Sequence, residues 1–178
     1  MANFHEAVLK TLVNEGGYLN DPCDPGGETY RGVSRRNHAN WSGWQIIDNY
    51  KNSPDFPRIL DADVPLQNMV EDVYAEGYWK TGYSQIDSQL IAEKLFDSGV
   101  LFGVGVAVRL LQATLNPTYG TEIDGSFGTD TLNAINQSEE NSLLNSYKSA
   151  LVAHILKVVM NKPQTNKFAA GWGKRVNS

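Results

Sequence analysis

The sequence predicts a mainly helical fold of the α+β class, with a small turn-rich lobe that holds a β-hairpin after the first helix. Apolar residues recur at helical spacing through most of the chain, and a run dense in Gly, Pro, Asn and Asp interrupts them at residues 16–27. Hydrophobic residues make up 41% and charged residues 20% of the 178 residues, which is ordinary globular usage and excludes intrinsic disorder. We therefore expect one globule, in which a segment 1–97 packs against a helical segment 98–178.

The first helix is predicted over residues 3–15, with Asn3 as its N-cap and Gly16 ending it in the left-handed conformation. The composition of residues 16–27 demands turns rather than regular structure. Residues 28–33 then follow as a short strand or the arm of a hairpin. The apolar stripe of the first helix consists of Phe4, Val8, Leu9, Leu12 and Val13.

Residues 37–63 are predicted to be irregular, apart from one or two helical turns at 44–50. A clear helix opened by proline follows at 65–80, because apolar side chains recur there on one face. Two helices, 88–97 and 104–115, are apolar almost all round, so we expect this pair to form the buried centre of the fold. The remaining predicted elements are a turn at 124–128 and helices at 129–137, 139–160 and 165–175.

The charge balance is acidic overall but uneven. Fifteen Lys and Arg against twenty Asp and Glu give a net charge of −5, which speaks against a protein that binds a nucleic-acid backbone. From Lys157 to the end there are five basic residues and no acidic ones, so this tail is either a solvated face or a local contact with an anionic polymer. The longest mostly apolar stretch, Val100 to Val108, is about half of the roughly 20 residues that a membrane-spanning helix needs.

Metal and nucleotide sites are not indicated by the sequence. Cys23 is the only cysteine, which excludes an internal disulfide and a cysteine-based metal site. The three histidines, His5, His38 and His154, lack metal-ligand spacing. The loop at 16–27 has neither the carboxylate spacing of a calcium loop nor the Lys-Ser/Thr pair of a P-loop. We therefore expect no metal and no organic cofactor.

Glu15 stands at the predicted C-terminal end of the first helix, where helical periodicity does not explain it. The helix dipole presents its negative pole there and disfavours a carboxylate by about 0.3–1 kcal/mol. The same field favours the protonated side chain, which is the form that a general acid needs. Glu15 is therefore a candidate catalytic acid, or else an exposed glutamate that happens to precede a glycine cap.

The loop after the first helix offers three more carboxylates and a hydroxyl group: Asp21, Asp24, Glu28 and Thr29. Hydrolysis of a glycosidic bond uses two carboxylates that flank the bond, and a nearby hydroxyl could hold the attacking water. Asp21 and Asp24 each precede a proline, so either could instead serve only as an Asx-turn residue.

Tyrosines and tryptophans are concentrated in the first half of the chain. Their flat rings can stack on sugar faces, and we expect two or three of them to line a groove while most pack in the core. These residues are Tyr18, Tyr30, Trp41, Trp44, Tyr50, Tyr74, Tyr78, Trp79 and Tyr83.

Several motifs together resemble one known family. Glu15-Gly-Gly-Tyr18, then Asn20-Asp-Pro-Cys-Asp-Pro-Gly-Gly-Glu-Thr29 and Gly32-Val-Ser34, are similar to the signature of the family 108 glycoside hydrolases. These are lysozyme-like N-acetylmuramidases, of which some members were named secretion activator proteins. The second half of the chain resembles the family's companion peptidoglycan-binding segment. The similarity continues through Tyr78-Trp79, Leu95-Phe-Asp97, Leu111-Gln112, Asp124-Gly125, Phe127-Gly128, Thr131, Phe168-Ala-Ala-Gly-Trp172 and Arg175-Val176.

The resemblance implies a lysozyme-like fold and cleavage of the β-1,4 bond between N-acetylmuramic acid and N-acetylglucosamine in peptidoglycan. It implies that Glu15 is the catalytic acid. The order of Glu15, Asp24 and Thr29 is similar to the Glu, Asp and Thr of phage-type lysozymes, with Asp21 or Asp97 as the next candidate should Asp24 point away. The residues that we expect to contact the substrate are Tyr18, Tyr30, Tyr78, Trp79 and Asp97.

We thus expect a monomeric glycoside hydrolase that acts on peptidoglycan strands, with no nucleic-acid partner and no transmembrane segment. The start of the sequence shows no signal-peptide pattern, so we expect synthesis in the cytoplasm and release to the wall by a non-classical or holin-like route. Two alternatives stay open. One is a non-catalytic wall-binding or secretion-assisting protein, and the other is a lytic transglycosylase, which needs one glutamate and no activated water.

Overall fold

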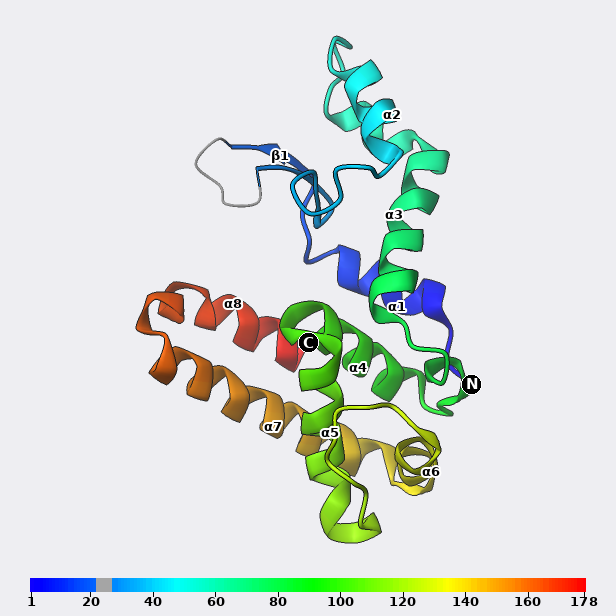
Figure 1. Cartoon of the computed structure of the whole chain (residues 1–178), viewed down its shortest axis with the longest axis vertical. Helices are drawn as coiled ribbons and strands as arrows, with labels where there is room; N and C mark the ends of the chain where they lie inside the picture. Colours follow the sequence, from blue (N-terminus) through cyan, green and yellow to red (C-terminus); the bar gives the residue numbers. More distant parts are fainter. Residues whose placement is uncertain (22–26) are drawn as a thin grey trace. The chain divides into compact units, whose positions relative to one another are not determined.

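The computed structural model of the chain describes residues 1–21 and 27–178, which are shown in Figure 1. In these ranges the chain forms eight α-helices, three short 3-10 helices and one three-stranded antiparallel sheet. The predicted class, mainly α with a small β lobe directly after the first helix, is confirmed. Within the same ranges no helix is both long and apolar enough to cross a membrane.

The chain divides into two compact units. The hairpin unit consists of Val8–Gly77, and the helical unit consists of Met1–Ala7 together with Tyr78–Ser178. Helix α1 (Phe4–Leu12) contributes residues to both units. The segment boundary predicted at residue 98 falls inside helix α4 (Gln89–Phe102).

Helix α1 ends at Leu12, three residues before its predicted end. The next amides, those of Asn14 and Glu15, bond to carbonyl oxygens only three residues back, so the chain tightens into a turn. Gly16 takes the predicted left-handed conformation, with a φ of 71°, but it lies four residues beyond the last residue of α1 instead of directly after the helix. Val13, predicted for the apolar stripe, is 83% exposed because it lies in this turn.

The sheet is formed by β1 (Tyr18–Asn20), β2 (Glu28–Tyr30) and β3 (Val33–Ser34), paired in that order. Strands β2 and β3 are joined by the two-residue turn Arg31-Gly32. The strand or hairpin arm predicted at 28–33 is therefore confirmed only for its first three residues, because residues 31 and 32 form the turn and Val33 begins the next strand. Strand β1 lies where turns alone are predicted. Its three residues become a strand only through pairing with β2, which local composition does not reveal.

Three helices complete the hairpin unit: α2 (Gly43–Tyr50), η1 (Arg58–Ala62) and α3 (Val64–Tyr78), whose last residue belongs to the helical unit. The helical turns predicted at 44–50 and the helix predicted at 65–80 are both confirmed, with ends that differ by one or two residues. The buried residues of α3 recur at a spacing of four, which is the expected pattern for one covered face. They are Leu66, Val70 and Tyr74.

The helical unit is built around α4 and α5 (Val104–Tyr119), the pair predicted to form the buried centre. Their inner side chains belong to one continuous apolar cluster with residues of α6 (Thr129–Gln137), α7 (Glu140–Asn161) and α8 (Asn166–Asn177). In Figure 1, α7 and α8, coloured orange to red, run side by side in opposite directions. The predicted centre of the fold is therefore confirmed.

A buried amide ties α5 to the start of α6. The side chain of Gln112 is 1% exposed, and its Oε1 atom accepts a hydrogen bond from the amide of Gly125 at 2.9 Å. Its Nε2 atom donates to Asp124 Oδ1 at 2.9 Å, the Ser126 carbonyl at 3.0 Å and Thr131 Oγ1 at 3.1 Å. Several residues of the family-like motifs in this half thus have a structural role, because they fix the connection between two core helices.

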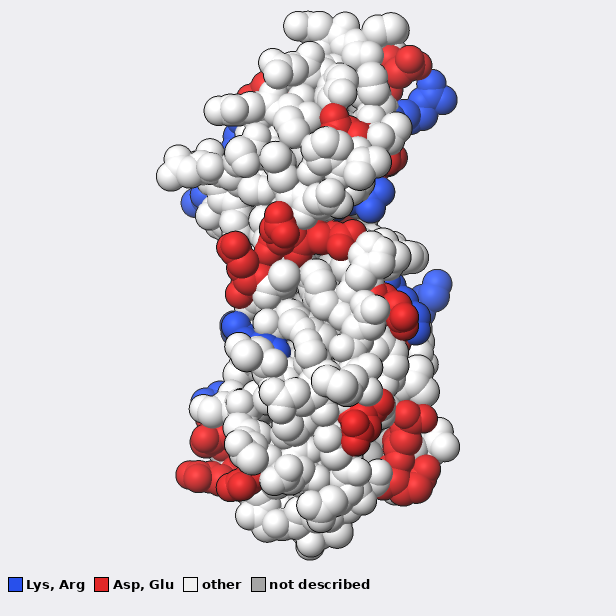
Figure 2. Space-filling view, turned by 90° about the vertical axis from the view of Figure 1, so that its right-hand side faces the viewer, with Lys and Arg blue, Asp and Glu red and all other residues white. Residues whose placement is uncertain are grey.

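Charge is distributed unevenly along the chain. Acidic side chains gather in several groups on the face shown in Figure 2. Glu140, at the start of α7, is the last acidic residue of the sequence. The rest of α7 and the whole of α8 therefore carry only basic charges.

Candidate active site

Glu15 lies in the turn between α1 and β1, within the hairpin unit, and its side chain is half-buried. Its Oε1 atom is covered by protein, and its Oε2 atom lies 3.0 Å from the position that a Cβ atom would take on Gly32. The carboxyl group therefore sits against the tip of the β2–β3 hairpin. Because α1 ends at Leu12, Glu15 lies beyond the last helical turn, where the field of the helix dipole falls off. The hairpin, and not the helix end expected from the sequence, sets its surroundings.

The tip of this hairpin needs glycine at position 32. Arg31 has a φ of 44° and Gly32 a φ of 79°, so both turn residues are left-handed, as a type I′ turn requires. The hydroxyl of Tyr74, from α3, donates to the Arg31 carbonyl at 3.0 Å. A Cβ atom on residue 32 would overlap that hydroxyl. The turn that carries Glu15, the Arg31-Gly32 turn and the side chain of Tyr74 from α3 thus come together in the hairpin unit.

Sequence reasoning did not identify Gly32 and Tyr74 as neighbours of the candidate acid. Gly32 is typical of a tight hairpin turn, but arginine seldom takes the left-handed conformation that Arg31 has, so the Arg-Gly pair is a weak signal for this turn. Tyr74 was predicted only as one of nine aromatic residues that could line a groove or pack in the core, and nothing in the sequence pairs it with Glu15. Its place at the site depends on how α3 packs on the hairpin.

Glu28, one of the loop carboxylates, belongs to a closed ring of four ion pairs. Its oxygens lie 2.6 Å from Arg35 Nε and 2.8 Å from Lys51 Nζ, and both cations also contact Asp48, at 2.6 and 2.7 Å. The Tyr18 hydroxyl donates to Glu28 at 2.8 Å. Burial alone would raise the pKa of Glu28, but hydrogen bonds from Lys51 and Tyr18 and the two nearby cations hold that pKa below its ordinary value. Glu28 is thus an ionised structural group, unsuited to donate a proton.

Of the loop residues predicted to assist Glu15, the structure describes Thr29 and Asp21 but not Asp24. Asp24 lies outside the described residues, so its pairing with Glu15 stays a prediction. Thr29 lies in β2 on the opposite sheet face from its neighbours in the strand, and its hydroxyl donates to the Gly27 carbonyl at 3.2 Å. Asp21 directly follows β1 and is exposed.

The two tyrosines expected to contact sugar in the hairpin unit differ in exposure. Tyr18 is half-buried, and its ring packs edge-on against Phe56 with the ring centres 4.7 Å apart. Tyr30 is 1% exposed, and its hydroxyl accepts a hydrogen bond from Gln67 Nε2 at 2.9 Å. The ring of Tyr30 therefore packs inside the hairpin unit and has no open face for a sugar in this conformation.

Tyr78 and Trp79, predicted as substrate contacts, begin the second part of the helical unit and are half-buried. The indole nitrogen of Trp79 donates to Ser84 Oγ at 3.0 Å. Its ring makes edge-on contacts with three aromatic rings whose centres lie 5.5 to 5.6 Å away, those of Phe4, Tyr83 and Phe96. Trp79 thus packs against the apolar cluster of the helical unit, and a role in binding sugar stays a prediction.

Asp97, the remaining predicted contact, is engaged by a cation within the helical unit. Arg175 Nε donates to its two oxygens at 3.0 and 3.2 Å, and Arg175 Nη2 lies 2.9 Å from Oδ1. The two side chains are only 13% and 11% exposed. This forked pair joins α4 to α8, a role that the sequence did not reveal, and contact with substrate stays a prediction.

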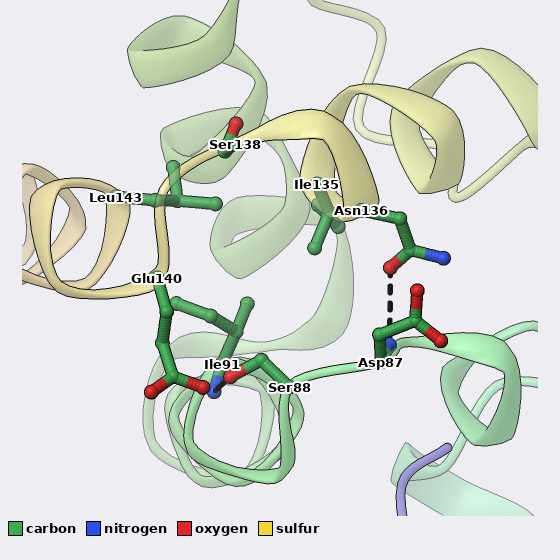
Figure 3. Close-up of a pocket in the computed structure, with 8 residues that line it drawn as sticks. All are labelled: Asp87, Ser88, Ile91, Ile135, Asn136, Ser138, Glu140 and Leu143. Carbon is green, nitrogen blue, oxygen red and sulfur yellow. Dashed lines mark hydrogen bonds between the residues drawn. The ribbon is translucent and has the colours of Figure 1, made fainter.

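A pocket of about 240 Å³ opens in the helical unit between the start of α4 and the α6–α7 connection (Figure 3). Its apolar part is formed by three buried side chains, those of Ile91, Ile135 and Leu143. Asp87 and Glu140, both exposed, flank it from two sides in Figure 3. Its other lining residues are Ser88, Asn136 and Ser138.

In the described part of the chain, no cluster of His, Cys, Asp and Glu could hold a metal ion.

Comparison with known proteins assigns the chain to a family. Residues 8–103 match the family described as Glycosyl hydrolase 108, and residues 106–177 match the family described as Predicted Peptidoglycan domain. The solved structure described as "Structure of Brucella abortus SagA" is similar in fold, with a TM-score of 0.66 and 24% sequence identity over 98% of this chain and 89% of that one. No curated protein sequence matches the chain. Since the first match covers more than half of the chain, this protein belongs to the glycosyl hydrolase 108 family and is, at family level, a glycosidase that acts on peptidoglycan.

Proposed function

We propose that this protein is an N-acetylmuramidase that hydrolyses the β-1,4 bond between N-acetylmuramic acid and N-acetylglucosamine, with Glu15 as the general acid. The observation that carries the proposal is the placement of the Glu15 carboxyl group against the tip of the β2–β3 hairpin. This site lies in the part of the chain that matches the glycosyl hydrolase family. The buried Oε1 atom and the closeness of Oε2 to Gly32 support the role, because an acid catalyst must be held in position.

In this mechanism, protonated Glu15 donates its proton to the glycosidic oxygen while positive charge develops on the sugar carbon. Asp24 stabilises that charge or, together with Thr29, orients the attacking water on the opposite face of the ring. Direct attack by water inverts the anomeric carbon, and NMR analysis of the first product anomer distinguishes this course from a covalent intermediate.

Replacement of Glu15 by glutamine tests the proposal. Glu15→Gln keeps the shape of the side chain but replaces the carboxylic acid by an amide, which has no acidic proton to donate. We expect peptidoglycan hydrolysis to fall by about 10²–10⁴-fold. Glu76→Gln, an exposed residue of the same unit, is the matched control and should hydrolyse normally. Release of reducing ends from purified sacculi is the readout. Wild-type activity in Glu15→Gln would refute the role of Glu15.

A non-catalytic wall-binding protein is the second candidate, and the pocket in the helical unit favours it. Five of its eight lining residues lie in the segment that matches the peptidoglycan domain. A non-catalytic wall-binding protein should bind sacculi without releasing reducing ends. Mass spectrometry of the released fragments also separates hydrolysis from lytic transglycosylation, because only the latter leaves anhydro-muramyl ends.

A further inference from the structure

The end of the α7–α8 hairpin combines unpaired positive charge with exposed apolar side chains. We define the basic tip as residues 156–168, which comprise the last turns of α7, η3 (Pro163–Thr165) and the start of α8. Its lysines are Lys157, Lys162 and Lys167. All three are exposed, and none of them is ion-paired to an acidic residue in the described part of the chain.

The positive charge of this part of the chain contrasts with the net negative charge of the whole sequence. Residues 141–178 contain six basic and no acidic residues, whereas the preceding 140 contain nine basic and twenty acidic ones. Two of the six basic residues are used within the fold, since Lys148 donates to the carbonyl oxygens of Asn177 and Ser178 and Arg175 pairs with Asp97. Among the described residues, by contrast, the ammonium groups of the basic tip make no ion pair with a carboxylate.

Three apolar side chains of the basic tip face solvent. Leu156 and Met160 are 61% and 81% exposed, and their spacing of four residues puts them on one face of α7. Phe168, at the start of α8, is 49% exposed. Its ring stacks on Trp172 with centres 5.8 Å apart, and Lys167 Nζ lies 4.9 Å from its ring centre. Trp172 packs on the apolar cluster, so it anchors Phe168 in this exposed position.

We propose that the basic tip docks this protein on anionic lipid membranes. Aliphatic and aromatic side chains beside lysines are the combination that enters the boundary between lipid headgroups and acyl chains. An anionic glycan would match the lysines but would leave Leu156 and Met160 without an apolar partner. A second copy of the chain would bring two positively charged tips together, which disfavours self-association through this surface.

Binding of the full-length protein to vesicles tests this inference. We expect at least tenfold more binding to vesicles of phosphatidylcholine with an equal share of phosphatidylglycerol than to phosphatidylcholine alone, and a decrease with added salt. Because each lysine near an anionic surface contributes about fivefold, the triple variant Lys157→Gln, Lys162→Gln, Lys167→Gln should bind about a hundredfold more weakly. The double variant Met160→Ser, Phe168→Ser should also bind about tenfold more weakly with its charge unchanged.

Two exposed residues of the hairpin unit give matched controls, Arg58→Gln for charge and Val64→Ser for apolar area, and both should bind like the wild type. Circular dichroism verifies that every variant is folded. Absence of vesicle binding by the wild type, or equal binding by the triple variant, overturns the inference. Binding to sacculi that depends on these lysines without any vesicle binding would overturn it in favour of an anionic wall polymer. Dimerisation that the double variant abolishes, without vesicle binding, would overturn it in favour of a second copy.

Discussion

The surroundings of Glu15 in the hairpin unit and the centre of the helical unit are held in place by different interactions. In the helical unit, side chains from five helices form a continuous apolar cluster. In the hairpin unit, the surroundings of Glu15 depend on the left-handed turn at Arg31-Gly32 and on the hydrogen bond from Tyr74, while a separate ring of ion pairs holds Glu28. The position of the candidate acid thus depends on specific local contacts, in a unit that also buries apolar side chains such as Leu66 and Val70, whereas the centre of the helical unit relies on apolar burial, which is less sensitive to direction.

The largest effect on stability is expected in the apolar cluster. Leu111 is completely buried, and Leu111→Ala should lower the free energy of unfolding by about 2–5 kcal/mol, because it leaves a cavity in a packed core. Leu90→Ala, at a position that is 43% exposed, is the control and should cost much less. Denaturant titration measures both. A loss below about 1 kcal/mol for Leu111→Ala would contradict tight packing around α5.

The Asp97–Arg175 pair is the main polar link within the helical unit. Asp97→Asn should lower the free energy of unfolding by about 2–4 kcal/mol, because it leaves a nearly buried guanidinium group without its counter-charge. Asp55→Asn, at a side chain 67% exposed, should have little effect. Thermal denaturation and KM for peptidoglycan are measured together. A raised KM with unchanged stability would instead favour Asp97 as a substrate contact.

Gly32 gives the sharpest test in the hairpin unit. Gly32→Ala should lower hydrolysis about a hundredfold, since the added methyl group displaces Tyr74 and reaches the Glu15 carboxyl group. The double variant with Tyr74→Phe removes the clashing hydroxyl and should recover part of this activity. Gly77→Ala is the matched control, because it meets open space in a helix and should leave activity intact. Full activity of Gly32→Ala would contradict the described surroundings of Glu15.

The ion-pair ring predicts a smaller, pH-dependent effect. The pKa of Glu28 is lowered in the folded state, so its stabilisation is present above the unfolded pKa of about 4.3 and is lost as pH falls through the folded value. Glu28→Gln should therefore cost about 1 kcal/mol at pH 7, and this difference should shrink below about pH 4. Melting temperatures across this pH range provide the measurement. A constant difference down to about pH 2 would show that Glu28 acts by packing alone.

Helix positions were the most predictable part of the fold. The buried α4–α5 pair and the helix at residues 65–80 follow from apolar periodicity, which is a local property of the chain. The end of α1 and the existence of β1 were not predictable in this way. Hydrogen bonds in the following turn determine where α1 ends, and pairing with β2 makes residues 18–20 a strand.

The helices, the turn-rich lobe after the first of them, and the family to which Glu15 and its motif point all follow from the amino-acid sequence. What surrounds the Glu15 carboxyl group depends on folding, because Gly32 and Tyr74 are distant from it along the chain. The same holds for Asp97 and Glu28, whose residue types suggested chemistry but whose cations come from α8, from the residue after α2 and from the residue after β3. Periodicity records which face of an element is buried, whereas the partner of a charge depends on how separate elements pack.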